Sequence, residues 1–159
     1  MWNNGKINIA YSKHERSLKV REILFKAKAI NRKDYYRSNY KDGDWVYGLI
    51  TKQYNARYDF PATMTNENGI SGIEVDYKTL SQYTGLKDKN GNKIFENDIL
   101  EYWENGKENI KQRLKVFYEN GQFVVDHYAI NLLNSRNMSS EIIGNIFDNP
   151  ELLEKGGAS

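Results

Sequence analysis

Apolar and polar residues alternate along several short stretches of the chain, as half-buried β-strands require. The alternation over residues 24–30 puts Lys26 and Lys28 on one face of a strand. The apolar residues of the other face are Phe25, Ala27 and Ala29. We predict that the lysine face is solvated and positive. A second strand, residues 45–50, follows the turn at 41–44, and both strands are expected in a first sheet.

Five Asn-Gly pairs mark tight turns, because this pair favours the positive φ angles of short hairpin loops. They begin at Asn4, Asn68, Asn90, Asn105 and Asn120. The last pair divides two apolar runs within residues 115–125 and predicts a hairpin. Alternation within that hairpin places Val116 and Tyr118 on the same face as Phe123 and Val125.

Helix signals are short. Residues 77–83 can form two turns, and residues 150–155 begin with Pro150 after Asn149, a helix-start pattern. Residues 53–72 are expected to be a loop or an irregular hairpin. We therefore predict a mainly β, α+β protein with one or two short helices. An N-terminal antiparallel sheet lobe spans residues 1–75, a small bent sheet or barrel spans 76–155, and 156–159 form a frayed tail.

Composition narrows the classes of function. The 159 residues include 12 tyrosines and two prolines, which suits strands. Cysteine is absent, which excludes disulfides, thiolate metal sites and a cysteine nucleophile, and suits a reducing compartment. The sequence has neither a membrane-length apolar run nor a secretory signal pattern. We predict a cytoplasmic protein that does not enter a membrane.

Charge is unevenly distributed along the chain. The net formal charge is +2, but residues 1–60 carry 13 basic and 6 acidic residues, whereas 61–159 carry 10 and 15. Basic strands beside aromatic residues can follow a phosphate backbone and stack bases. The nucleic-acid-binding candidates are Lys26, Lys28, Arg32, Lys33, Arg37, Tyr35 and Tyr36. The alternatives are a solvated strand face and basic and acidic halves that pack together, within one molecule or in a homo-oligomer.

The segment SQYTGLKDKNGNKIFENDILEYW, residues 81–103, raises the question of whether it builds an active site or a turn. Glycine, asparagine and aspartate at these spacings favour bent backbone and local hydrogen bonds. The predicted structural turn residues are Gly85, Asp88, Asn90, Gly91, Asn97 and Asp98. The alternative is a carboxylate metal or acid-base site that uses Asp88, Glu96 or Asp98.

Other catalytic signals are weak. The two histidines, His14 and His127, have no ligand or base at metal or triad spacing, and no phosphate-loop or nucleophile-elbow motif occurs. We predict no enzymatic activity, no catalytic residues, no metal site and no cofactor.

Three blocks of the sequence together resemble the YopX family. The first is VREILFKA at 20–27 with WVYG at 45–48, the second is QYTGLKDKNGNKIFENDI at 82–99, and the third is IGNIFDNPELL at 143–153. Asn97 stands where the family usually has glycine, and residues 1–19 extend beyond its usual start.

The resemblance implies a phage or prophage origin and a β-rich fold, and it supplies no catalytic residues to carry over. Together with the charge pattern it predicts an accessory binding module that acts on nucleic acid or a host protein inside the bacterial cell. A metal-dependent enzyme acting on nucleic acid and a self-assembling structural protein are the alternatives.

Overall fold

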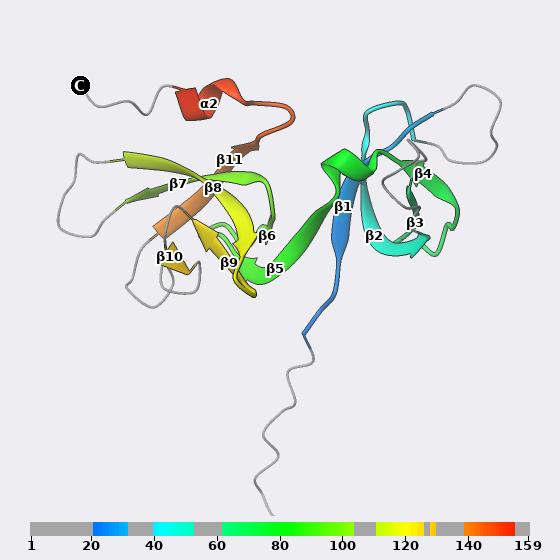
Figure 1. The fold of residues 1–159 in the computed structure, drawn as a ribbon, viewed down its shortest axis with the longest axis horizontal. Coiled ribbons are helices and arrows are strands. Elements are labelled where there is room, and N and C mark those ends of the chain that lie inside the picture. Colours follow the sequence, from blue (N-terminus) through cyan, green and yellow to red (C-terminus); the bar gives the residue numbers. More distant parts are fainter. Residues whose placement is uncertain are drawn as a thin grey trace, which may run out of the picture.

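Two antiparallel β-sheets lie side by side in the computed structural model (Figure 1). The structure describes residues 21–31, 40–52, 62–103, 111–125, 128–129 and 139–154. Strands dominate these residues, and the helical elements are short. The prediction of a mainly β fold is therefore confirmed.

The first sheet has six strands in the order β4-β3-β2-β1-β5-β6. Their bounds are β1 Phe25–Lys28, β2 Trp45–Lys52, β3 Ala62–Asn66, β4 Ile73–Val75, β5 Ser81–Lys87 and β6 Lys93–Phe95. β1 is central and pairs with β2 on one side and β5 on the other. Both strands predicted at 24–30 and 45–50 are present, but β3 falls within residues 53–72, where only a loop or irregular hairpin was expected.

The second sheet has five strands in the order β10-β9-β8-β7-β11. Their bounds are β7 Asp98–Trp103, β8 Lys111–Glu119, β9 Gln122–Val125, β10 Tyr128–Ala129 and β11 Ser139–Asn145. β10 and β11 are its two ends, so the sheet is open and the barrel alternative is wrong. The sheet alternative is the form that the structure shows.

The chain changes sheets later than the sequence indicated. Residues 81–95 were expected to begin the second sheet, but β5 pairs with β1 through Phe25↔Gln82 and Lys26↔Ser81. The free edge of β1 accepts β5, and β6 follows it in the same sheet. The sheets therefore divide between β6 and β7, and a lobe boundary near residue 75 does not coincide with the change of sheet.

One hydrophobic cluster lies within the first sheet, and a second is shared between the two sheets. In the first sheet, Ala27, Val46, Met64 and Val75 are fully buried and pack with Phe25 at the margin. The second cluster joins Ile94 of β6 to four buried residues of the second sheet, Leu100, Val116, Phe123 and Val125. Burying a large aliphatic side chain contributes about 1.5–3 kcal/mol, so these clusters supply the main stabilisation of both sheets.

The predicted hairpin at 115–125 is present as β8 and β9. Val116 pairs with Val125 and Tyr118 with Phe123, and the rings of the latter pair lie 5.2 Å apart, edge to face. Asn120 has φ +50° and Gly121 has φ +84°. Both central turn residues are left-handed, as an Asn-Gly hairpin loop requires.

The helical elements are shorter than predicted. Tyr77–Thr79 forms one 3₁₀ turn, η1, capped by Asp76, and strand β5 begins at Ser81 because its backbone pairs with β1. The C-terminal helix α2 spans Glu151–Glu154. The predicted tail, 156–159, lies outside the described residues.

Candidate functional site

The two lysines of β1 point toward the second sheet. Lys26 donates a hydrogen bond to Asp98 at the start of β7, and Lys28 donates one to Asp148. Lys26 is 6% exposed, so the prediction of a solvated lysine face is wrong at this position. Alternation fixed the faces of the strand correctly, since Ala27 and Ala29 are in the core. The second sheet then covers the lysine face, which alternation cannot reveal.

Lys26 is buried among aromatic rings. Its Nζ lies 4.9 Å from the Trp45 ring centroid and 5.1 Å from that of Phe95. The ring faces carry negative charge density and compensate part of the lost hydration of the ammonium. A buried charge needs a partner as well, and Asp98 provides it.

Asp98 serves both a turn and this ion pair. Its Oδ2 accepts the Phe95 N–H at 2.8 Å, which closes the turn before β7 as predicted. Burial raises the pKa of Asp98 above its usual range, against the opposing effects of Lys26 and the Phe95 N–H. The preceding residue, Asn97, has φ +67° and donates to Ser81 Oγ at 3.1 Å.

Asp148, in the turn after β11, accepts a second set of hydrogen bonds, which links this turn to the first sheet. Its carboxylate accepts hydrogen bonds from Lys28 and, at 2.9 Å each, from Trp45 Nε1 and Asn145 Nδ2. Burial alone raises the pKa of Asp148, but these donors lower it to about 2. Asn145 Oδ1 also accepts the Phe147 and Asp148 N–H groups at 3.0 Å, which holds the turn that presents the carboxylate.

The loop between β5 and β6 is organised by Asp88, as predicted. Its Oδ1 accepts the N–H groups of Asn90 and Asn92 at 2.9 and 2.8 Å, and its Oδ2 accepts Asn92 Nδ2 and the Ile142 N–H at 3.1 and 3.3 Å. Burial alone raises the pKa of Asp88, but the hydrogen bonds hold it below its usual range. Gly91 closes the turn with φ +86°.

Gly85 also has a positive φ, +87°, within β5. The pairing of β5 with β6 shifts register between Tyr83 and Lys87, which spans this glycine. The segment 81–103 therefore builds two turns and a bent strand, and its aspartates are held by backbone amides.

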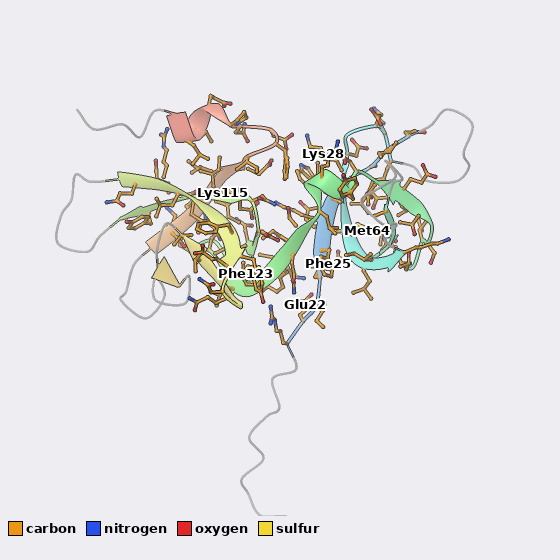
Figure 2. The ribbon with its side chains drawn as sticks, viewed as in Figure 1. Glu22, Phe25, Lys28, Met64, Lys115 and Phe123 are labelled. Carbon is orange, nitrogen blue, oxygen red and sulfur yellow. The ribbon has the colours of Figure 1, made fainter. Side chains whose placement is uncertain are left out.

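A cleft with a volume of about 660 Å³ separates the two sheets. Lys26 and Asp98 form part of its wall, and so do the rings of Trp45, Tyr47 and Phe95. The other lining residues are Leu24, Glu67, Gly91, Asn92, Lys93, Ile142, Gly144 and Asn145. Side chains crowd the space between β1 and the second sheet in Figure 2, with Lys28 at one end of β1 and Glu22 beyond the other.

The rim of the cleft carries a further ionic group. Lys93 Nζ lies 2.6 Å from Glu22 Oε1 and 3.9 Å from Glu67 Oε1. Tyr47 is 40% exposed and packs edge to face on Phe95, with ring centroids 5.7 Å apart. The rim thus combines an accessible phenol ring with charges of both signs.

The remaining nucleic-acid candidates, Arg32, Lys33, Arg37, Tyr35 and Tyr36, lie outside the described residues. Within the described part of the chain, no group of three His, Asp or Glu side chains is arranged to hold a metal ion.

Sequence reasoning missed several cleft residues. Trp45 and Tyr47 are on one face of β2 because they are two residues apart, so their shared position was readable. Asn145 and Asp148 were visible only as part of the IGNIFDN segment. The contacts of Asp148 with Lys28 on β1 and Trp45 on β2, more than 100 residues earlier, have no local signal.

The chain is thus a small, mainly β protein, with two open antiparallel sheets and a polar, aromatic-lined cleft between them. The family model described as YopX protein matches residues 25–154. This chain therefore belongs to the YopX family, as its three sequence blocks predicted, and residues 1–19 lie outside the match.

A solved structure supports the fold. The crystal structure of protein EF1440 from Enterococcus faecalis is similar to this chain, with a TM-score of 0.50 and 24% sequence identity over 84% of this chain and 99% of that one. At this identity the likeness concerns the fold alone. No curated protein matches the chain. Among the described residues, no helix is long and apolar enough to cross a membrane.

Proposed function

We propose that this YopX-family protein is a non-enzymatic binding module, encoded by a phage or prophage, that takes a segment of another protein into the cleft between its sheets inside the bacterial cell. The observation that carries the proposal is the 660 Å³ cleft bordered by the exposed Tyr47. Its volume is in the range of ligand sites, which usually combine aromatic walls with a few polar groups. Tyrosine is also a common anchor at protein interfaces.

The ion pairs of Lys26 and Lys28 favour a protein over nucleic acid as the partner. Lys26 and Lys28 are already paired with Asp98 and Asp148. A phosphate would have to displace a carboxylate from each lysine, which removes most of the electrostatic gain of binding there. Strand β1 is therefore poorly suited to bind a phosphate backbone, whatever Arg32, Lys33 and Arg37 contribute.

The hydrogen bonds of Asp88 and Asp98, two of the three candidate carboxylates, favour the non-enzymatic alternative. Both oxygens of Asp88 and of Asp98 accept hydrogen bonds from within the protein. A carboxylate that acts as a base or binds a metal needs an oxygen directed at the substrate or ion. An assay on DNA and RNA with added magnesium or manganese tests the enzyme alternative, and we expect no cleavage.

Site-specific photo-crosslinking tests the proposed function. A photoreactive phenylalanine analogue replaces Tyr47 in the full chain, which is expressed in a bacterial host, irradiated and analysed by mass spectrometry. The matched control places the same analogue at Tyr118, which is 54% exposed on the second sheet. We expect a discrete protein adduct from position 47 and none of the same mass from position 118.

Other outcomes of this experiment would contradict the proposal. Nuclease-sensitive adducts at position 47 would replace it with nucleic-acid binding. Adducts only with further copies of this chain would favour the self-assembling alternative and the predicted homo-oligomer, which light scattering of the purified protein measures directly. No adduct at position 47 would remove the cleft as a binding site.

A further inference from the structure

We propose that the cleft selects a basic segment of its partner, with an arginine side chain that stacks on Tyr47 and pairs with Glu67. This inference rests on the proposed function and names the chemistry of the ligand. It follows from the way charges are paired around the cleft.

The two lysines that line the cleft, Lys26 and Lys93, have partners at short range, and so does Lys28 on the same strand as Lys26. Lys26 and Lys28 donate to Asp98 and Asp148, and Lys93 lies 2.6 Å from Glu22. An entering anion therefore meets cations whose charge is already compensated. It also meets the carboxylates that compensate them.

Glu67 differs from these carboxylates because its contact with a lysine is longer. Its nearest oxygen is 3.9 Å from Lys93 Nζ, which is beyond hydrogen-bond range, and its side chain is 61% exposed. The carboxylate is thus accessible to an entering cation. Such a pair at a rim contributes modest energy but sets the preferred sign of the ligand.

Tyr47 lies beside Glu67 because β2 and β3 are paired. Gly48 is opposite Asn66, so the adjacent residues Tyr47 and Glu67 emerge at the same end of this strand pair, and both line the cleft. Phe95 packs edge to face against Tyr47, and 40% of Tyr47 stays exposed. A planar guanidinium can stack on an aromatic ring while it donates to a carboxylate, which an ammonium does less well.

The electrostatic environment of Tyr47 agrees with this geometry. Burial raises the pKa of its hydroxyl, and the charges of Asp98, Asp148 and Glu67 raise it further. Burial disfavours a charge of either sign, but the three carboxylates that disfavour the negative phenolate favour a cation in the same place.

Short blocked peptides test the inference on the full-length protein. Three pentapeptides share threonine and valine flanks and differ only in the central residue, which is arginine, its neutral isostere citrulline, or glutamate. Binding is followed by chemical-shift changes of the Tyr47 and Asn92 amides during NMR titration. We expect the arginine peptide to bind at least about threefold more tightly than the citrulline peptide, and the glutamate peptide to bind most weakly.

Variants assign the preference to Glu67. In Glu67→Gln the arginine peptide should bind no better than the citrulline peptide. Glu119→Gln, which changes an exposed carboxylate on β8, should preserve the preference. Equal or tighter binding of the glutamate peptide, shifts confined to residues outside the cleft, or an unchanged preference in Glu67→Gln would each overturn the inference.

The two proposals fail separately. A protein adduct at position 47 together with no arginine preference leaves the binding module intact and refutes the basic ligand. Absence of both the adduct and any peptide-induced shift at the cleft refutes both proposals.

Discussion

Lys26 and Asp98 are 72 residues apart in the sequence and form a buried ion pair between the first sheet and the first strand of the second. Their side chains are 8% and 2% exposed. The pair joins β1, which carries two of the nucleic-acid-binding candidates, to the turn that contains the candidate carboxylate Asp98. Both residues are therefore committed to holding the sheets together at the wall of the cleft.

Breaking this pair should destabilise the protein strongly. Lys26→Ala leaves the Asp98 carboxylate buried without its cation, and we expect a loss of about 3–5 kcal/mol in the free energy of unfolding. Urea denaturation followed by tryptophan fluorescence measures the loss. Lys41→Ala, at an exposed turn position, is the control and should change stability by less than about 0.5 kcal/mol.

The double variant Lys26→Met with Asp98→Asn removes both charges of the pair and keeps the space of the lysine stem filled. Asparagine retains an oxygen that can accept the Phe95 N–H, and methionine fills the space between the Trp45 and Phe95 rings. We expect this variant to be more stable than Lys26→Ala, because no unpaired charge remains buried. A double variant as unstable as Lys26→Ala would mean that the unpaired buried carboxylate is not what destabilises Lys26→Ala.

Asp148 should make folding stability depend on pH in the acid range. Its pKa is lowered from 3.8 to about 2 in the folded protein, so the unfolded chain binds its proton more tightly. The resulting stabilisation is present in full above about pH 4 and is lost as the pH falls toward 2. Because the side chain is 36% exposed, solvent screening reduces the contribution to about 1 kcal/mol.

Urea midpoints between pH 5 and 2 measure this contribution. Asp148→Asn should lower stability at pH 5 and flatten the decline below pH 4. Glu119→Gln is the matched acid-to-amide control outside the cleft. Parallel curves for Asp148→Asn and the parent protein would show that Asp148 does not titrate with the lowered pKa.

Gly91 should resist substitution because of its backbone angle. An added Cβ would meet nothing within 4 Å, so the cost comes from the φ of +86°. We expect Gly91→Val to lose about 1–2 kcal/mol and Gly91→Asn to lose less, because asparagine tolerates the left-handed region better. Thermal or urea unfolding compares the two. A valine variant as stable as the parent would contradict the turn geometry.

Gly48 should resist substitution for a different reason. A Cβ at this position would lie 1.9 Å from the Thr65 carbonyl oxygen, in the backbone of the paired strand β3. Gly48→Ala must therefore shift β2 or β3, and we expect a loss of about 1–3 kcal/mol or more. Hydrogen exchange of the β3 amides shows whether this strand has lost protection. The loss of stability in Gly48→Ala should be larger than that in Gly91→Ala. Equal protection of β3 in Gly48→Ala and the parent would refute the close approach.

Local features of the fold were predictable from the sequence. The Asn120-Gly121 turn and the facing of Tyr118 with Phe123 follow from backbone preferences and alternation over a few residues. Asp88 as the organiser of its own loop follows from the tendency of aspartate to accept nearby amides. The cleft was not predictable, because its walls come from β1, β2, the end of β3, the β5–β6 region, β7 and β11. No local pattern shows that these segments lie together.

The sequence by itself determined which residues of 81–103 bend the chain, which face of β1 is apolar, and the family to which the chain belongs. Tertiary structure alone decided that the lysine face of β1 is covered and that Lys26 and Lys28 are paired with Asp98 and Asp148. The reason is physical: turns and alternation depend on neighbouring residues and backbone angles. The environment of a charged side chain depends on which distant segment packs against it.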